Sequence, residues 1–400
     1  MFLTVLTVAE GLAALTPARR SAIVRTAPAR GVVPAMPVLA DEPMPPWARA
    51  TLDGYAVRAA DTYAASESLP TLLEVTGGVQ MGCAPEGEVG PGGAMAIPTG
   101  GLLPAGADAV VMIEHTSEPM PGHVEVLRGV APGEGVLQPG EEAAEGDVLV
   151  PAGRPLRTAE LGLLASAGVT ELDAYAPPRV GIVSTGDEVV APETPSLAAG
   201  QVRDACAPAL AGLVREASGE PVLRGIVPDD AAALERTLAQ AVAEDDVVVV
   251  SAGSSVGARD VTATVVANLG ELVCHGLAIK PGKPTLLADC GGTPLVGLPG
   301  NPRSALVVFR LVGVPLVRRV AGITVPPPAP VVRARLARDV PSAAGRLDVV
   351  QVTIDDGTAV PRFGSSALLG PMVGADGWIR VPEPATGLAA GSDVDVELYR

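Results

Sequence analysis

Lysine is almost absent from this chain: Lys280 and Lys283 are the only two among 400 residues, and the other 26 of the 28 basic residues are arginines. Both lie in the segment Ala278-Ile279-Lys280-Pro281-Gly282-Lys283-Pro284. Because proline fixes φ and glycine permits tight backbone geometry, Pro281-Gly282 predicts a turn between them. A lysine ammonium is a compact charge on a flexible stem, which suits phosphates and other oxyanions. The pair therefore predicts an anion site; the alternative is two solvent-exposed lysines in a turn.

Aromatic residues are also scarce, at 2%, and the formal net charge is −17. Single-stranded nucleic acids are bound on aromatic stacking surfaces, and a strongly acidic protein repels polyanions. The composition therefore predicts no nucleic-acid partner. A small anion can still bind where the charge is locally positive, and the lysine turn is the candidate for such a place.

Cysteine, histidine and long hydrophobic runs are limited too. The cysteines form no Cys-x-x-Cys pair and no cluster with histidine, which predicts reduced thiols in a cytoplasmic protein and no His/Cys metal site. No apolar run approaches the roughly 18 residues of a membrane span, and Arg310 interrupts the longest. The apolar N-terminus lacks a basic region and meets Glu10 early, so it predicts a helix or strand rather than a signal peptide. The four cysteines are Cys83, Cys206, Cys274 and Cys290, and the three histidines are His115, His123 and His275.

The chain divides into three regions that differ in composition and in hydrophobic pattern. Residues 1–176 are rich in Gly and Pro with short β-like runs, which predicts one or two small β-rich lobes. Residues 177–325 alternate strand and helix patterns, which predicts a parallel sheet covered by helices on both faces. Residues 326–328 are three prolines, typical of a linker, and residues 329–400 predict a small β domain. The predicted fold is thus a multi-domain α/β plus β protein with a central three-layer α/β/α domain.

Polar loops follow the predicted strands of the central region. In open α/β sheets, ligands bind beyond the carboxyl ends of the strands. Backbone N–H groups and hydroxyls in such loops can hold a phosphate, and the carboxylates can bind Mg²⁺. Each loop alone is equally compatible with a structural turn, and Asp229-Asp230 most simply cap the helix that follows. The loops are Ser184-Thr185-Gly186-Asp187-Glu188, Ser251-Ala252-Gly253-Ser254-Ser255-Val256-Gly257 with Asp260, and Gly297-Leu298-Pro299-Gly300-Asn301-Pro302-Arg303-Ser304.

Six motifs together resemble the molybdopterin molybdenumtransferase family, which includes the E domain of gephyrin, over nearly the whole chain. Their order and spacing carry the resemblance, because no single motif is specific. They are Asp53-Gly54-Tyr55-Ala56-Val57-Arg58; Ile97-Pro98-Thr99-Gly100 followed by residues 103–112; Ser184-Thr185-Gly186-Asp187-Glu188; Ile279-Lys280-Pro281-Gly282-Lys283-Pro284; Gly297-Leu298-Pro299-Gly300-Asn301-Pro302; and Gly345-Arg346-Leu347-Asp348.

The resemblance implies an elongated homodimer whose active site is shared between subunits. In this family, molybdate is inserted into the dithiolene of adenylated molybdopterin with release of AMP and with the help of Mg²⁺. By the same resemblance, the catalytic residues are Asp53, Thr99, Glu188, Asp260, Lys280 and Lys283, and the metal ligands are Asp187, Glu188 and Asp260. The residues expected to bind adenylated molybdopterin are Ser184, Thr185, Gly186, Gly253, Ser254, Ser255, Gly257, Pro299, Gly300 and Asn301. Those expected to bind molybdate are Lys283, Pro284, Ser304, Arg346 and Ser365. The simplest alternative for Arg346 is an ion pair with Asp348.

The chain departs from the family pattern at several positions. Residues 49–52 replace the usual Asn-Ser-Ala-Met, and residues 252–257 replace Gly-Gly-Val-Ser-Val-Gly. Asp204-Ala205-Cys206 stands where the family has Asp-Ser/Thr-Asn, Gly140-Glu141-Glu142 stands for Gly-Glu-Asp, and Arg303 stands for valine. These changes leave open a divergent or non-catalytic protein of the same fold that binds molybdopterin or a nucleotide. A nucleotide pyrophosphatase that uses the central domain alone would not explain the matching N- and C-terminal regions.

Overall fold

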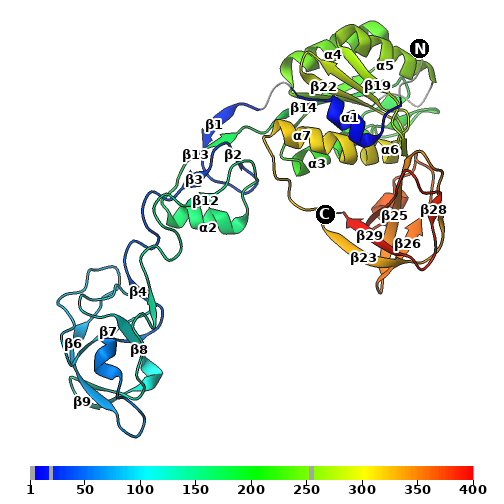
Figure 1. The fold of residues 1–400 in the computed structure, drawn as a ribbon. Helices are drawn as coiled ribbons and strands as arrows, with labels where there is room; N and C mark the ends of the chain where they lie inside the picture. Colours follow the sequence, from blue (N-terminus) through cyan, green and yellow to red (C-terminus); the bar gives the residue numbers. More distant parts are fainter. Residues whose placement is uncertain (1–4, 18–20, 252–255, 400) are drawn as a thin grey trace. The chain divides into compact units, whose positions relative to one another are not determined.

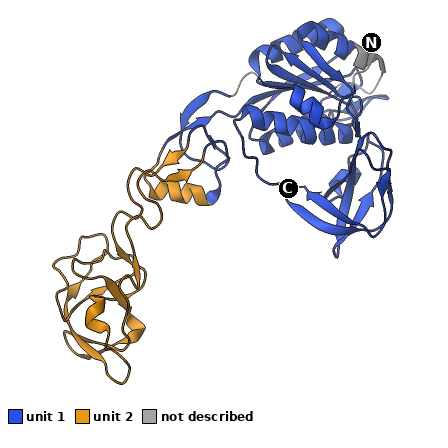
Figure 2. Cartoon of the chain, in the orientation of Figure 1, with its two compact units in different colours: residues 1–36, 152–158, 171–400 blue, residues 37–151, 159–170 orange. Residues whose placement is uncertain are grey.

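The computed structural model describes residues 5–17, 21–251 and 256–399, with side chains omitted for residues 256–260. Figure 1 shows the fold, and Figure 2 shows its two compact units. Unit 1 comprises residues 1–36, 152–158 and 171–400, and unit 2 comprises residues 37–151 and 159–170.

Unit 1 contains a six-stranded sheet in the order β17-β14-β18-β22-β21-β19. Strands β17, β14, β18 and β22 are parallel, as the alternating pattern predicted. The prediction of a wholly parallel sheet was wrong at one edge, where β21 and then β19 run antiparallel. The cause is a two-residue turn, Gly291-Gly292, in which both residues have positive φ and which joins β21 and β22 as a hairpin. The strands are β14 (Arg179–Thr185), β17 (Glu220–Val227), β18 (Val247–Ser251), β19 (Glu271–His275), β21 (Leu286–Cys290) and β22 (Thr293–Leu298).

Helices cover both faces of this sheet and create two separate cores. In β18, Val247 and Val249 belong to the core with the first set of helices, while Val248 and Val250 belong to the core on the opposite face. The predicted three-layer α/β/α arrangement is confirmed. The first core contains residues of α3 (Cys206–Glu216), α6 (Pro302–Val308), the π-helical turn η3 (Phe309–Gly313) and α7 (Val314–Val320); the second contains residues of α4 (Ala231–Glu244) and α5 (Val256–Leu269).

The first helix belongs to this domain. Helix α1 (Val8–Ala14) begins with a capping box between Thr7 and Glu10, and Leu15, directly after it, is buried in the first core. The apolar N-terminus therefore packs on the α/β domain, although we had predicted residues 1–176 as a β-rich region. The rest of unit 1 before the sheet is the three-stranded sheet β1 (Ile23–Thr26), β13 (Leu172–Tyr175) and β2 (Val33–Pro34).

Unit 2 is β-rich, as predicted for the N-terminal region. Its main sheet has the order β8-β5-β7-β6-β10-β9 and is packed around small apolar side chains such as Ala94 and Val124. The elements are β3 (Val38–Leu39), β4 (Arg49–Ala50), β5 (Gly54–Val57), η1 (Ala59–Thr62), β6 (Thr71–Gly78), β7 (Gly93–Ile97), β8 (Ala109–Met112), η2 (Ile113–His115), β9 (Thr116–Met120), β10 (His123–Val126), β11 (Val136–Leu137), β12 (Val148–Val150) and α2 (Thr158–Ser166).

The C-terminal part of unit 1 is the expected β domain, and it is joined to the α/β domain by a strand pair. The short strand β20 (Ile279–Lys280) runs parallel to β25 (Leu347–Asp355), with Lys280 opposite Asp348. Val349 and Trp378 of this domain also belong to the first core. The other elements of this domain are β23 (Val331–Leu336), β24 (Val340–Pro341), β26 (Thr358–Arg362), α8 (Gly370–Val373), β27 (Gly377–Val381), β28 (Gly387–Leu388) and β29 (Asp393–Leu398). The short strands β15 (Val189–Val190) and β16 (Val202–Arg203) pair with each other between β14 and α3.

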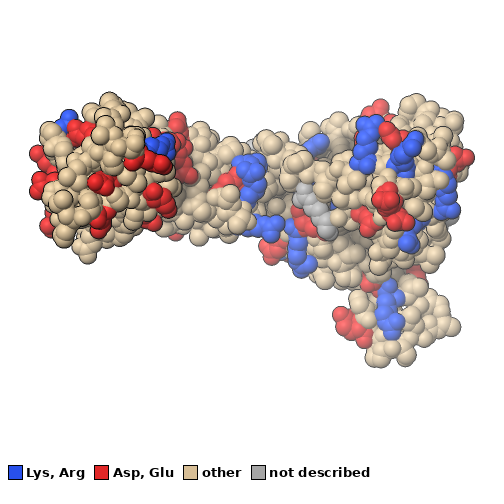
Figure 3. All heavy atoms as spheres, turned by 90° about the horizontal axis from the view of Figure 1, so that it is seen from below, with Lys and Arg blue, Asp and Glu red and all other residues tan. Residues whose placement is uncertain are grey.

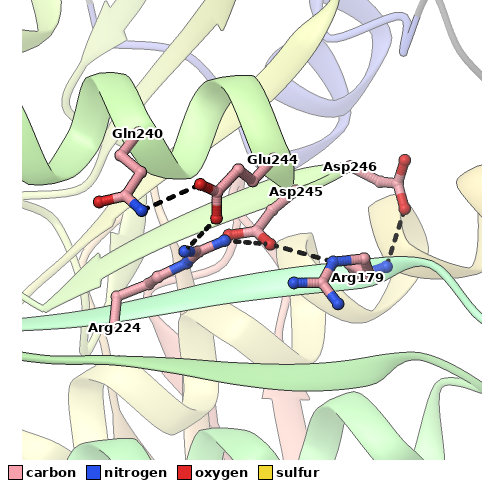
Figure 4. Close-up of polar contacts among 6 residues, drawn as sticks. All are labelled: Arg179, Arg224, Gln240, Glu244, Asp245 and Asp246. Atoms are coloured by element: carbon pink, nitrogen blue, oxygen red, sulfur yellow. Dashed lines mark hydrogen bonds and ion pairs between the residues drawn. The ribbon is translucent and has the colours of Figure 1, made fainter.

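A buried ion-pair network ties α4 to the sheet (Figure 4). Asp245, directly after α4, accepts hydrogen bonds from Arg224 Nε at 2.8 Å and Nη2 at 2.7 Å. Arg179 Nε approaches the same carboxylate at 3.5 Å. Arg179 begins β14 and Asp245 precedes β18, so the network lies near the amino ends of these strands, opposite the edge where ligands bind in such sheets.

None of the helices that the structure describes is long and apolar enough to cross a membrane.

Candidate active site

A cavity of about 740 Å³ lies around the lysine turn, and we call it the cationic cavity. It is lined by the lysine turn, the start of α6 and parts of the C-terminal β domain. Its charged lining is five cations and one carboxylate: Lys280, Lys283, Arg303, Arg346, Arg362 and Asp348. Of the residues predicted for the site, it also contains Pro284, Pro299, Asn301 and Ser304. The structure thus brings together the lysine pair, Ser304 and Arg346, which are far apart in sequence.

The backbone of the lysine turn is held on several sides. Gly282 has φ +120°, and a Cβ there would lie 2.3 Å from Cγ2 of Val308, so both the conformation and the close packing require glycine. Thr285 Oγ1 donates to the Gly282 carbonyl at 2.6 Å, and the Leu277 N–H donates to the Lys283 carbonyl at 2.9 Å. The two exposed lysine side chains therefore extend from a turn that is fixed by packing and hydrogen bonds.

Asp348 connects two of the cations. Its nearly buried carboxylate accepts a hydrogen bond from Arg346 Nε at 2.8 Å and lies 3.6 Å from Lys280 Nζ. The alternative interpretation of Arg346 as the partner of Asp348 is therefore correct in geometry, while Arg346 also lines the cavity. Lys283 has no ion-pair partner among the residues described, so its charge is available to a ligand.

A second cavity, of about 460 Å³, lies beyond the carboxyl ends of β14 and β18, and we call it the strand-end cavity. Its lining includes Ser184, Thr185, Glu188, Gly300 and Asn301 from the predicted site, with Asp204 and Ser251. Asn301 lines the cationic cavity as well, so the two cavities adjoin at this residue.

Asp204 organises the floor of the strand-end cavity. Ser184 Oγ donates to its Oδ2 at 2.6 Å, and the N–H groups of Cys206 and Ala207 donate to its Oδ1 at 2.9 and 3.0 Å. Asp204 thus holds the first residues of α3 and orients the Ser184 hydroxyl. The replacement at Cys206 lies beside this network, where burial, followed by the charge of Asp204, raises the pKa of the thiol to about 12.

Three carboxylates gather beside this cavity. Burial first, and then the charges of Asp187 and Glu188, raise the pKa of Asp229, and the Asp229 N–H donates to Asp187 Oδ1 at 3.1 Å. A cation would relieve this repulsion, and carboxylate oxygens are the ligands that Mg²⁺ prefers. No group of three His, Cys, Asp or Glu side chains that could hold a metal occurs in the described part of the chain. The side chain of Asp260, the third predicted ligand, lies outside that part.

Asp53 and Thr99, the predicted site residues of unit 2, contact each other. The Thr99 N–H donates to Asp53 Oδ1 at 2.7 Å, and this hydrogen bond, followed by one from the Thr99 side chain, lowers the pKa of Asp53. The carboxylate is therefore ionised and exposed at neutral pH.

Other predicted residues stand apart from the two cavities or cannot be placed. Gly186 is not among the residues that line either cavity. It permits a turn with φ +135°, where a Cβ would lie 2.7 Å from Glu188 Oε2. Ser365 does not line the cationic cavity; its neighbour Ser366 does, and accepts a hydrogen bond from Asn301 Nδ2 at 2.9 Å. The predicted residues Gly253, Ser254 and Ser255 lie outside the described residues, while Gly257 and Asp260 fall in the first turns of α5, whose side chains are not described.

Sequence reasoning missed three polar residues that line the cationic cavity, Gln351, Arg362 and Ser366. Gln351 and Arg362 lie opposite each other on β25 and β26. In the sequence, each is visible only as a polar residue within an otherwise apolar strand pattern. Such a residue does not indicate a site unless it is known which strands pair and in which register.

The negative charge is distributed unevenly between the units. Unit 2 contains 18 acidic residues and only three basic ones, Arg49, Arg58 and Arg128. On the face shown in Figure 3, patches of acidic side chains are scattered over unit 2 with few basic ones, whereas basic side chains appear in several places on unit 1. The five cations of the cationic cavity all belong to unit 1, which is close to neutral.

Family models match the chain in three consecutive segments. The model described as the MoeA N-terminal region (domain I and II) matches residues 6–168. A model of a probable molybdopterin binding domain matches residues 181–319, and one of the MoeA C-terminal region (domain IV) matches residues 333–399.

Curated relatives and solved structures agree with these matches. A molybdopterin molybdenumtransferase of Nostoc sp. is 37% identical over 299 residues, covering 74% of this chain and 68% of the relative. Molybdopterin molybdenumtransferase 2 of Mycobacterium tuberculosis is 32% identical over 381 residues, 92% of each chain. The crystal structure of a molybdopterin biosynthesis moeA protein from Pyrococcus horikoshii is similar with a TM-score of 0.87 at 29% identity, over 99% of this chain and 100% of that one.

Proposed function

This chain belongs to the molybdopterin molybdenumtransferase family, and on that premise we propose that it inserts molybdate into adenylated molybdopterin and releases AMP. The reaction is a step of molybdenum cofactor biosynthesis. The observation that carries the proposal is the cationic cavity, where five cations and one carboxylate meet in a chain of net charge −17. Molybdate is a dianion, so it is attracted to this local excess of positive charge.

Within this proposal, the two cavities divide the substrates between them. Lys283 and Arg346, with the hydroxyl of Ser304, hold molybdate in the cationic cavity, because ammonium, guanidinium and hydroxyl groups all donate to oxyanions. Ser184 and Asn301 in the strand-end cavity bind the phosphate-bearing substrate. Since Asn301 lines both cavities, the two substrates can meet beside it.

Magnesium belongs to the same proposal. Asp187 and Glu188 would hold it together with Asp260. The pKa of Asp229 is raised first by burial and then by the charges of Asp187 and Glu188, and this crowding of carboxylates supports a cation there. When bound, Mg²⁺ would neutralise phosphate charge. The residues of the chain itself contribute oriented donors, above all the Ser184 hydroxyl fixed by Asp204.

We place the enzyme in the cytoplasm as a homodimer whose active site is shared between subunits. The four cysteines are free thiols, which suits a reducing compartment. The strongly acidic unit 2 and the cationic cavity of unit 1 have complementary charge, which supports a contact between Asp53 of one subunit and the cavity of its partner.

The test is turnover by the purified chain with adenylated molybdopterin, molybdate and Mg²⁺, followed as AMP release and as molybdenum in the pterin product. We expect activity in the unchanged protein and a large loss in Lys280→Ala/Lys283→Ala, because a charge-assisted contact to an oxyanion contributes about 1.5–3 kcal/mol. The matched control is Arg333→Ala, which removes an exposed cation paired with Asp393. Substrate binding without AMP release in the unchanged protein would instead identify a non-catalytic binding protein of this fold.

A further inference from the structure

Arg303 is a buried cation without a carboxylate partner. It is 8% exposed and lines the cationic cavity. Nη2 donates to the Gly364 carbonyl at 2.6 Å, whereas Nε and Nη1 have no hydrogen-bond partner in the described part of the chain. The nearby Tyr399 does not neutralise it, because burial raises the pKa of that hydroxyl and keeps it uncharged. Two N–H-bearing nitrogens of a permanent cation are therefore left without a protein acceptor.

Such an arrangement is unfavourable unless something else completes it. A buried polar group normally finds a hydrogen-bond partner, and a buried charge normally finds a counter-charge. The other cations of the cavity differ from Arg303: Lys280 and Arg346 share Asp348, and Lys283 and Arg362 are exposed to water. Arg303 is thus the cation of this cavity that has neither a carboxylate partner among the described residues nor ready access to water.

A second buried donor lies on the same cavity. Gln351 of β25 is buried and lines the cationic cavity, and its Nε2 also lacks a hydrogen-bond partner within the described residues. The amide lies close enough to the Tyr399 hydroxyl to offset part of the rise that burial causes in the pKa of that group, but neither Gln351 Nε2 nor Tyr399 Oη has a partner at hydrogen-bond geometry among the described residues. The groups without a partner on Arg303 and Gln351 are both N–H donors, and N–H donors complement an oxyanion, which accepts hydrogen bonds and carries negative charge.

We propose that Arg303 and Gln351 form an inner oxyanion position of the cationic cavity, which takes a tetrahedral oxyanion of the molybdate or phosphate class. The cavity of about 740 Å³ has room for such an ion beside the lysine turn. The inference deepens the proposed function and rests on it for the identity of the ion: with molybdate as substrate, Arg303 is an additional binding residue that raises the affinity for it.

The test compares oxyanion affinity in the full-length chain by isothermal titration calorimetry, with molybdate, phosphate and sulfate titrated separately. Arg303→Met keeps much of the side-chain volume and removes the charge, and we expect it to weaken binding of the preferred oxyanion about tenfold to a hundredfold, as for loss of one charge-assisted hydrogen bond. Arg333→Met, the matched control on an exposed arginine, should leave the affinity unchanged. The ranking of the three anions in the unchanged protein identifies the source of the oxyanion.

Thermal unfolding supplies an independent readout. Arg303→Met removes an uncompensated buried charge and loses one hydrogen bond to the Gly364 carbonyl. These effects oppose each other, so we expect the variant to be about as stable as the unchanged protein without anion. Saturating molybdate should then raise the midpoint of the unchanged protein more than that of the variant. Equal affinities and equal anion-induced shifts in the two proteins would overturn the proposal and make Arg303 a packing residue.

Gln351→Leu provides a second variant should Arg303→Met fold poorly. We expect weaker oxyanion binding from it as well, by a smaller factor because the lost donor is neutral. Unchanged affinity in every folded variant refutes the inner position. The outcome is separable from that of the proposed function: AMP release with Arg303-independent molybdate binding leaves the function standing, whereas Arg303-dependent binding without AMP release retains the oxyanion position and refutes the enzyme.

Discussion

Replacing Asp245 should destabilise the α/β domain strongly. Its side chain is fully buried, with 0% exposure, and it is the main partner of Arg224, whose side chain is 12% exposed. Removing one member of a buried ion pair leaves the other as an uncompensated charge and costs about 3–5 kcal/mol. Glu244 still contacts Arg224 in an Asp245→Ala protein, so we expect about 3 kcal/mol, the lower end of this range.

The measurement is urea unfolding followed by tryptophan fluorescence. Trp47 belongs to unit 2, and Trp378 is buried in the core that joins the α/β and C-terminal domains. In a Trp47→Phe background, Trp378 therefore reports on the relevant part of the molecule.

The controls decide whether the network acts as a unit. Arg333→Met breaks a pair with 74% and 53% exposed side chains and should cost at most about 1 kcal/mol. The double variant Arg224→Met/Asp245→Ala should lose clearly less stability than the two single changes added together. It leaves no buried charge without a partner, because Arg179 and Glu244 are about half exposed and remain hydrated. A loss below about 1 kcal/mol for Asp245→Ala, or strict additivity in the double variant, would refute the reasoning.

Three further predictions follow from individual contacts. Co-expressed Asp53→Ala and Lys283→Ala chains, each inactive alone, should regain AMP release as heterodimers; verified heterodimers without activity would place the site within one chain. Gly282→Ala should reduce oxyanion affinity, measured by calorimetry, because a Cβ would lie 2.3 Å from a Val308 methyl carbon; unchanged affinity would show that the turn adapts. Glu118→Gln should lower the pKa of Tyr55 from about 12, measured by ultraviolet titration, since the hydrogen bond to Glu118 is the main cause of the rise. The Tyr55 contribution to stability should therefore be complete below about pH 10 and disappear as the pH rises through 12; an unchanged titration would refute that cause.

Sequence-based prediction succeeded where a single residue determines the structure next to it, as at the start of a helix. Asp230 was predicted to cap the helix after it, and its side chain accepts a hydrogen bond from the Ala233 N–H at 2.7 Å at the start of α4. The alternation of apolar strands and amphipathic helices correctly predicted three layers. The antiparallel edge was missed because it depends on a local turn, the Gly291-Gly292 hairpin. We had interpreted this region from its alternation of strands and helices, which predicts parallel strands.

The site could be predicted only in part, because the side of the cationic cavity formed by the C-terminal β domain depends on pairing between strands that are distant in sequence. The lysine turn was apparent because lysine is otherwise absent. Asp348 and Gln351 reach the same cavity because β20 pairs with β25, and no periodicity reveals which strand of another domain will pair with a two-residue strand. The shift from Ser365 to Ser366 is a one-residue difference in a loop, where alternation gives no guide to side-chain direction.

Burial explains why a charge at position 303 is better carried by arginine than by lysine, whereas lysine is suited to the exposed turn. The Lys280 side chain is 58% exposed, so its ammonium stays hydrated. At the site of Arg303 an ammonium would be desolvated, and burial can lower the pKa of a lysine by 3–5 units from about 10.4, which removes its charge near neutral pH. Burial also lowers the pKa of the Arg303 guanidinium, but this group starts at about 12.5 or above and keeps its proton. A cation that must stay charged in the wall of the cavity without a carboxylate beside it is therefore better supplied by an arginine than by a lysine.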